Sequence, residues 1–264
     1  MMKKKKLFIF LIGLILLALL SCQAAANLPN PFATATPTST PTFTPSPTSS
    51  PTPTAAYTPT PPPTGTTKEK QTDGTTIFTD YDNQYKLVFP AGWAIVGLSP
   101  DDLNQLMQLA SKDNPDLEQT INMLKTMDPK VFRVFAFDFL ANDMADGYTT
   151  NINVTGINNS IIKAMTLQQV VDATTGSFPQ ISKKIQVTSS KVTQTASNTP
   201  IGLIELTMPI NTSTGVKISV YERVIIFQVP QGSIEITLST PASMQSRILP
   251  LFNQVIDSFR KLGN

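Results

Sequence analysis

The sequence contains no histidine and only one cysteine, Cys22. Without histidine the chain cannot build a Ser-His-Asp or Cys-His catalytic device, nor a zinc site from His and Cys ligands. A single cysteine also leaves no intramolecular disulfide, so the fold must be held by its hydrophobic core. We therefore expect a protein that is not an enzyme and that carries no metal or cofactor.

Charge is sparse and nearly balanced. Charged residues make up 14% of the chain, and four of the 20 basic residues lie in Lys3–Lys6. Beyond that segment 16 basic residues face 18 acidic ones, which leaves the rest of the chain weakly acidic. Such a surface has no electrostatic footprint for nucleic acid. We expect no nucleic-acid partner.

The N-terminus has the layout of an export signal. Lys3–Lys6 precede an uncharged apolar run from Leu7 to Leu20, which Ser21 and Cys22 follow. A basic region, a short apolar region and a small residue before the cleavage point are typical of a signal peptide. The apolar run is shorter than the roughly 20 residues that a membrane span needs. Residues 1–21 are therefore interpreted as a signal peptide.

The end of this segment, Leu19-Leu20-Ser21-Cys22, resembles the lipobox of bacterial lipoproteins. The resemblance implies that Cys22 carries fatty acids such as palmitate and becomes the mature N-terminus. Two acyl chains suffice for stable anchoring, so the protein would sit on the cell membrane and face away from the cytoplasm. A plain secretory signal and an uncleaved anchor are the alternatives.

A Thr- and Pro-rich segment follows the cysteine. Twelve of the 22 prolines lie between Pro29 and Pro63, and no charged residue appears until Lys68. This composition buries too little apolar surface to offset chain entropy, and repeated proline favours an extended chain of about 3.1 Å per residue. We interpret residues 22–74 as a lipidated N-terminus and a disordered stalk that ends in a polar hinge from Lys68 to Gly74. The threonines are either bare or sites for O-linked sugars.

The remaining residues, 75–264, are enough for one domain with its own core. Hydrophobic patterning predicts helices that begin at Ser99 and Asn114, a helix over 167–178 and a C-terminal helix over 248–259. It predicts strands over 76–81, 85–89, 93–96, 131–140, 151–157, 185–195, 201–208, 216–229 and 233–239. The order predicts an α+β fold, a mainly antiparallel sheet with helices on both faces.

Two of these strands have distinctive patterns. Residues 131–140 are apolar on both faces, with Phe135, Phe137 and Phe139 on one side and Phe132 on the other, which predicts a central strand covered on both sides. Residues 185–195 are the most polar of the last four strands and are a candidate edge strand.

Two motifs resemble those of the PsbP-like family. They comprise Phe78, Asp80, Asp82-Asn83, Tyr85, Leu87, Phe89-Pro90 and Gly92-Trp93 near the start, and Ile256-Asp257-Ser258-Phe259 at the end. The resemblance covers residues 75–261 and implies an α/β/α sandwich with a six- or seven-stranded antiparallel sheet. It also implies that Trp93 and Phe259 fill the core, that Asn83 makes a turn and that Gly92 allows a bend. The metal-binding histidines of the photosynthetic subunit have no counterpart here.

Methionines gather on the two helices predicted before residue 131. Met107, Met123 and Met127 fall in this region, and methionine recurs on adaptable binding surfaces. These three residues are a candidate groove for a small hydrophobic ligand beneath a movable helical flap. Ordinary core packing is the alternative.

Two groups of acids are weaker candidates. Glu205, Glu222 and Glu235 lie on predicted strands, and acid–base chemistry would require two of them to approach within about 5–10 Å. The alternative is an outward polar face. Asp138, Asp143 and Asp146 fall on one loop but lack the ligand spacing of a calcium-binding EF-hand, so a solvated loop is the simpler interpretation.

These features together predict a membrane-anchored extracytoplasmic lipoprotein. Its domain would act as a non-enzymatic binding or interaction module of the cell envelope, with another envelope protein or a cell-wall component as partner. The alternative function is the binding of a small hydrophobic ligand.

Overall fold

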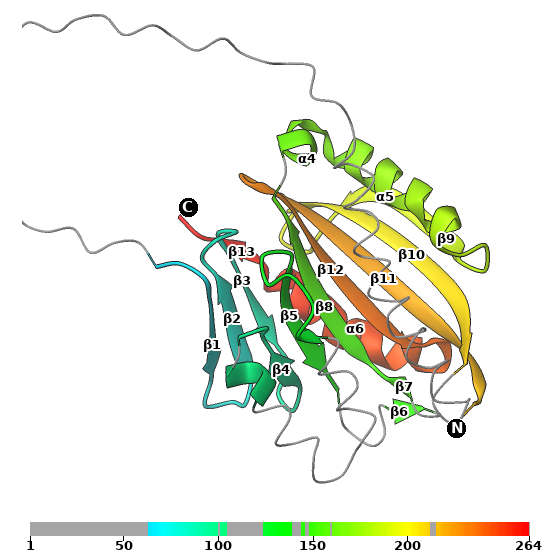
Figure 1. Ribbon diagram of the computed structural model, residues 1–264, viewed down its shortest axis with the longest axis horizontal. Coiled ribbons are helices and arrows are strands. Elements are labelled where there is room, and N and C mark those ends of the chain that lie inside the picture. Colours follow the sequence, from blue (N-terminus) through cyan, green and yellow to red (C-terminus); the bar gives the residue numbers. More distant parts are fainter. Residues whose placement is uncertain are drawn as a thin grey trace, which may run out of the picture.

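The computed structural model describes residues 63–99, 101–104, 124–138, 144–145, 148–158, 160–211 and 215–263. The predicted signal peptide, Cys22, most of the stalk and most of the helix predicted to begin at Asn114 lie outside these residues. Within them the chain folds into two antiparallel sheets with helices against them (Figure 1).

The smaller sheet has four strands in the order β1 (Thr66–Lys70), β2 (Thr76–Asp80), β3 (Tyr85–Phe89) and β13 (Arg260–Lys261). The larger sheet has seven, in the order β4 (Ala94–Val96), β5 (Phe132–Phe137), β8 (Asn151–Ile157), β12 (Gly232–Pro241), β11 (Lys217–Val229), β10 (Pro200–Asn211) and β9 (Gln186–Gln194). β6 (Met144–Ala145) pairs with β7 (Tyr148–Thr149). The helices are α4 (Ser160–Ala164), α5 (Leu167–Ile181) and α6 (Gln245–Asp257), with a 3₁₀ turn η2 (Ala242–Met244).

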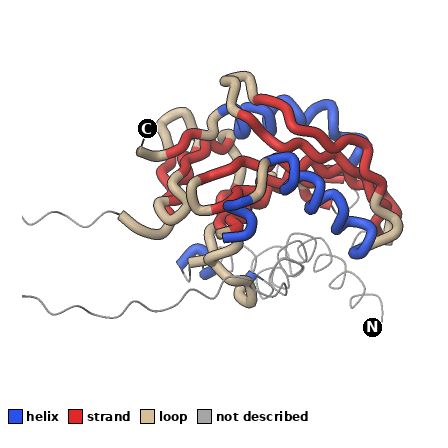
Figure 2. The backbone as a smooth tube through the Cα atoms, turned by 90° about the horizontal axis from the view of Figure 1, so that it is seen from above, coloured by secondary structure: helices blue, strands red, loops and turns tan. Residues whose placement is uncertain are grey.

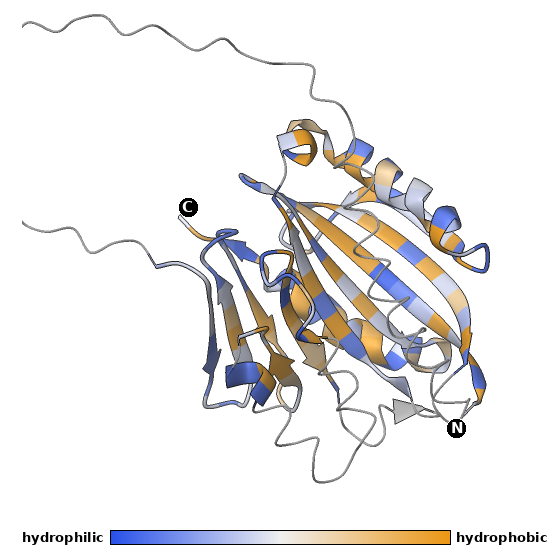
Figure 3. Cartoon of the chain, in the orientation of Figure 1, coloured by the Kyte–Doolittle hydropathy of each residue, from blue (hydrophilic) through white to orange (hydrophobic). Residues whose placement is uncertain are grey.

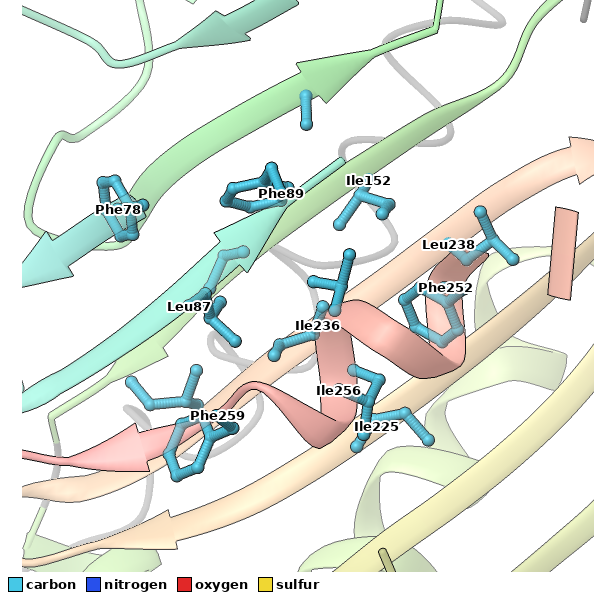
Figure 4. Close-up of a cluster of buried hydrophobic side chains, with 14 of the residues drawn as sticks. Phe78, Leu87, Phe89, Ile152, Ile225, Ile236, Leu238, Phe252, Ile256 and Phe259 are labelled. Carbon is cyan, nitrogen blue, oxygen red and sulfur yellow. The ribbon is translucent and has the colours of Figure 1, made fainter. Parts of the chain in front are cut away.

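Helices lie on both sides of the strands when the molecule is seen from above (Figure 2). α6 and the small sheet cover one face of the large sheet, and Figure 4 shows Phe252 and Ile256 of α6 beside Ile225, Ile236 and Leu238. α5 covers the other face, where Val170, Val171 and Phe178 pack with apolar side chains of β10 and β11. The alternating apolar residues of the strands supply both interfaces (Figure 3). The predicted seven-stranded α+β architecture is confirmed.

The start of α5 follows from a capping box. The Thr166 hydroxyl accepts from the backbone N–H of Gln169 at 3.3 Å, and the Gln169 side chain accepts from the backbone N–H of Thr166 at 2.8 Å. A serine cap also begins the helix predicted at Ser99, because Ser99 Oγ accepts from the backbone N–H of Asp102 at 3.2 Å and residues 101–104 are helical.

The polar hinge predicted from Lys68 to Gly74 is wrong over its first residues, which belong to β1. This strand pairs with β2 from Thr66 opposite Asp80 to Lys70 opposite Thr76. Every β1 side chain is exposed, so the segment has no apolar alternation and its composition indicates a loop. Its backbone hydrogen bonds to β2 and the ion pair of Lys68 with Asp102 hold it on the domain.

β5 is covered on both faces, as predicted, but it is not central, because only β4 lies between it and the sheet edge. A register shift between Phe132 and Val134 interrupts the strand. The predicted alternation is therefore wrong at Phe132, which joins the same cluster as Phe135. A β-bulge adds one residue to a strand and moves the side chains that follow to the other face. Here the bulge frees Arg133 to leave the ladder and point toward the small sheet.

Arg133 of β5 and Asp80 of β2 form a buried ion pair between the two sheets. Arg133 Nε donates to Asp80 Oδ2 at 2.7 Å and Nη2 donates to Oδ1 at 3.0 Å. Nη2 also reaches Asp82 Oδ2 at 2.7 Å, and Nη1 donates to the Pro129 carbonyl at 2.6 Å. Asp80 is 0% and Arg133 6% exposed. Both charges are thus paired and hydrogen-bonded, which a buried pair requires.

The turn between β2 and β3 adjoins this ion pair. The Asn83 backbone N–H and side-chain amide donate to Asp80 at 3.0 and 2.8 Å, so Asn83 both makes the turn and holds the carboxylate. The left-handed residue of the turn is Gln84, at φ 59°. Gly156 of β8 lets the turn approach the large sheet, because a Cβ there would lie 3.0 Å from Asn83 Nδ2.

The other residues of the two motifs occupy the predicted places. Trp93 and Phe259 are buried in the main core, and the Phe259 ring stacks on Phe227 with centroids 3.8 Å apart. Gly92 has φ 84°, which glycine adopts readily. Among the described helices, none has both the length and the apolar character required to cross a membrane.

Arg133→Met should destabilise the domain by about 3 kcal/mol or more, because it leaves the Asp80 carboxylate buried without its cation. The free energy of unfolding from urea titration measures this loss. Lys86→Gln, which removes a cation from an exposed position of β3, should change it by less than about 0.5 kcal/mol. Adding Asp80→Asn to Arg133→Met should recover part of the loss; equal effects of Arg133→Met and Lys86→Gln would contradict the structural role of the pair.

Candidate functional site

The face of the large sheet beneath α5 carries two buried carboxylates. Glu222 of β11 is 3% exposed and Glu235 of β12 is 4% exposed. Glu222 lies opposite Ser239, and Glu235 lies opposite Ile226, which packs with α5. Residues opposite one another in an antiparallel pair share a face, as do residues two or four apart along a strand. Both carboxylates therefore project from the same face of the sheet.

Glu205 projects from the opposite face, because its neighbour across the ladder is Arg223 rather than Glu222. Arg223 Nη2 donates to Glu205 Oε1 at 2.7 Å, and the Tyr221 hydroxyl donates to the same oxygen. Burial raises the pKa of Glu205, but the hydrogen bonds from Tyr221 and Arg223 outweigh it and hold that pKa below its ordinary value. Arg223 and Glu205 thus form an ion pair across the β10–β11 ladder.

Glu222 and Glu235 are too far apart to act as an acid–base pair. They lie on adjacent strands and four positions apart along the ladder, which corresponds to about 14 Å between their Cα atoms. An acid and base that flank one bond need carboxyl groups within about 5–10 Å. Glu222 and Glu235 are thus separated along the sheet, and Glu205 lies on the opposite face from both of them.

The surroundings of each buried carboxylate favour its protonated form. Burial raises the pKa of Glu222 to about 8, against a lowering by the Ser239 hydroxyl, which donates to Oε1 at 3.2 Å. Burial raises the pKa of Glu235 to about 7, against a lowering by Thr174 of α5. Glu235 Oε1 and the nearby Ser233 Oγ have no hydrogen-bond partner in the part of the chain that the structure describes. These groups form a buried polar strip on the α5 face.

Of the three residues of the candidate hydrophobic groove, the structure describes only Met127. Met107 and Met123 lie outside the described residues, as does Cys22. Met127 is partly buried and packs against a cluster that includes Leu103, Leu124 and Phe132. The groove stays a prediction.

Of the three aspartates considered for calcium binding, the structure describes only Asp138. Asp138 is buried, and its backbone N–H donates to the Thr150 carbonyl at 3.0 Å, whereas Asp143 and Asp146 fall outside the described residues. Across the described ranges, His, Cys, Asp and Glu form no group of three or more that could hold a metal ion.

Sequence reasoning missed Arg133, which donates four hydrogen bonds at the junction of the sheets. A lone cation within the apolar run from Val131 to Phe137 was the available signal, because a buried arginine requires an anionic partner. The pattern did identify the exposed edge, since the strand predicted over 185–195 is β9, the last strand of the large sheet.

The two carboxylates predict a pH-dependent stability. Unfolded glutamate titrates near 4.5, whereas the folded groups keep their protons to about pH 7 and 8. Between pH 4.5 and these folded pKa values, the folded state therefore binds more protons than the unfolded state. The free energy of unfolding should fall as pH rises from about 5 to 8 and then level off. Glu222→Gln should reduce this fall by about 1.4 kcal/mol per unit of pKa difference. Chemical denaturation at pH 5, 6.5 and 8 measures it, with the exposed Glu69→Gln as control; an unchanged slope in Glu222→Gln would contradict the assignment.

Comparison with known proteins gives structural likenesses only. No protein-family model matches the chain, and no curated protein has a significantly similar sequence. Among solved structures, the cyanobacterial PsbP protein CyanoP of Synechocystis is similar, with 14% identity, a TM-score of 0.44, and 72% of this chain and 94% of that chain covered.

Two further solved structures have a similar degree of likeness. The Ran-binding protein Mog1p of Saccharomyces cerevisiae has 12% identity and a TM-score of 0.41, over 71% of this chain and 95% of that chain. LpqN of Mycobacterium tuberculosis, described as involved in cell envelope biogenesis, has 8% identity and a TM-score of 0.38, over 74% of this chain and 88% of that one. A PsbP protein is thus among the structural neighbours, and at these scores the likenesses carry no argument about function.

Proposed function

We propose that the protein is a lipid-anchored, extracytoplasmic interaction module of the cell envelope. The observation that carries the proposal is the order of segments at the N-terminus: the basic and apolar signal, Cys22, and then the Thr- and Pro-rich stretch up to β1. In this arrangement acyl chains on Cys22 hold the protein at the membrane, and the stalk carries the domain away from it.

The placement of β1 supports a tethered module. β1 is the first strand of the described chain and lies at the small-sheet end of the molecule, whereas β9 lies at the other end (Figure 1). A stalk that enters at β1 therefore leaves the α5 and β9 end directed away from its attachment point. That end is available to a partner, which we take to be another envelope protein or a cell-wall component.

A binding role also agrees with the chemistry of the described polar groups. Glu222 and Glu235 lie apart on the sheet, and Glu205 forms an ion pair with Arg223. The buried carboxylate of Asp80 accepts hydrogen bonds from Arg133 and Asn83. Glu205 and Asp80 thus stabilise the fold, and Glu222 and Glu235 lie too far apart to act together as an acid and a base. The absence of histidine from the whole chain removes the commonest general base.

Cys22→Ala should abolish incorporation of a labelled fatty acid, because the alanine side chain has no thiol to acylate. Metabolic labelling of the full chain in a bacterial host, followed by affinity capture, measures the incorporation. Ser21→Ala is the matched control, since it keeps a small residue before the cysteine, and it should retain the label.

Intact mass should show that the mature chain begins at an acylated Cys22. Label that persists in Cys22→Ala, or a mature protein that is unacylated and starts at another residue, would show that the proposal is wrong.

A further inference from the structure

In the described part of the chain, β9 is an edge strand of the seven-stranded sheet. Within the described residues it pairs only with β10. It is nine residues long, contains no proline or glycine, and has Lys191 as its only charged residue. Val187 is 37% and Val192 40% exposed, so two of the four large apolar side chains exposed in the described chain belong to this strand. Long, weakly charged edges of this kind template pairing with another strand.

The ladder with β10 shows which backbone groups of β9 face outward. The Thr195 N–H donates to the Thr199 carbonyl at 3.0 Å, so these two residues form a hydrogen-bonded pair. Such pairs alternate along an antiparallel ladder, which directs the backbone groups of Thr193 and Lys191 toward β10 and those of Ser190, Val192 and Gln194 outward. Pro200, which has no N–H, lies opposite Gln194, where no hydrogen bond to β9 is needed.

The three outward residues are self-complementary about Val192. In an antiparallel pairing of two β9 strands with a two-fold axis at Val192, Val192 faces its own copy and Ser190 faces Gln194. Their N–H and C=O groups then make six backbone hydrogen bonds. The exposed valine side chains meet at the axis, and Lys191 lies opposite Thr193 rather than its own copy, which avoids like-charge repulsion.

The position of α5 agrees with this register. The Thr175 hydroxyl of α5 contacts the Ser190 hydroxyl at 2.8 Å, so the C-terminal half of the helix lies over the first half of β9. With the axis at Val192, the C-terminal half of α5 in one copy lies beside the C-terminal end of β9 in the other copy. At that end residues 194–195 lead into a turn. The two α5 helices are thus offset along the ladder. The register shift between Glu205 and Leu206 marks a bulge on β9 near Thr188, which limits pairing to residues 189–195.

We propose that β9 pairs with β9 of a second copy of this chain and joins two seven-stranded sheets across a two-fold axis at Val192. The contact is short, and its area falls below the roughly 1,200 Å² typical of stable interfaces. Pairing is therefore weak in dilute solution and strengthens when copies share one surface, because tethering raises their effective concentration. The strengthening by tethering rests on the proposed membrane anchor, whereas the geometry of the pairing is independent of it.

Single cysteines introduced into the full chain test the register. In this pairing the two Val192 Cα atoms lie about 5.5 Å apart, within the range that a disulfide spans. Two copies of residue 190, or of residue 194, are about 14 Å apart. Mild oxidation of membranes that carry Val192→Cys should therefore give at least about tenfold more disulfide dimer than Ser190→Cys or Gln194→Cys. Co-expressed Ser190→Cys and Gln194→Cys chains with different tags should form the mixed dimer.

Two controls separate this proposal from the membrane anchor. Val187→Cys is the matched exposed valine beyond the bulge and should give little dimer. The unaltered chain has only Cys22, so a disulfide dimer in that chain would show a free thiol at Cys22 and contradict the anchor, not the pairing. Equal yields from Val192→Cys and Val187→Cys, or a disulfide from Val192→Cys only to a different protein, would overturn the proposal.

Discussion

The buried ion pair between Arg133 and Asp80 is the contact on which the arrangement of the two sheets depends. It joins β5 of the large sheet to β2 of the small one with two hydrogen bonds, and both side chains are removed from water. Because an unpaired buried charge is costly, this pair tolerates only one relative placement of the sheets. The apolar contacts around it, such as the stack of Phe227 on Phe259, are less directional. The ion pair thus provides specificity and the core provides most of the stability.

The two faces of the large sheet differ in how they accommodate polar groups. On the α6 face, Glu205, Tyr221 and Arg223 hydrogen-bond to one another, and the side chains of Glu205 and Arg223 are still partly exposed. On the α5 face, Glu222 and Glu235 are buried with few partners, and burial raises their pKa values. Natural domains rarely keep such groups without compensation. Each of these carboxylates therefore lowers the stability of the fold as pH rises toward its folded pKa.

β1 and β9 lie at opposite ends of the described structure (Figure 1). The chain enters through β1, whose side chains are exposed and which is held by backbone hydrogen bonds and the ion pair of Lys68 with Asp102. The opposite margin of the large sheet ends in β9, with outward backbone groups and two exposed valines. In the proposed function, this separation would keep the β9 edge away from the membrane.

Much of the fold followed from local pattern. Alternation and helical spacing predicted the strands of the large sheet, both principal helices and the polar edge at β9, because half-buried elements repeat apolar residues with their own period. The interpretation of the segment before the domain, with Cys22 and its prolines, stays a prediction. β1 was not, since none of its side chains is buried. The side of the sheet taken by Glu205 was not either, because register depends on pairing across strands distant in sequence.

The sequence by itself determined the chemistry available to this protein: no histidine, one cysteine, and a domain whose apolar periodicity specifies an α+β core. The tertiary structure alone decided which groups meet. It placed Arg133 on Asp80 through a bulge in β5, and it put Glu222 and Glu235 on one face but too far apart to cooperate. The physical reason is that local periodicity is set by the backbone of each element, whereas ion pairs, registers and burial arise between residues that only the folded chain brings together.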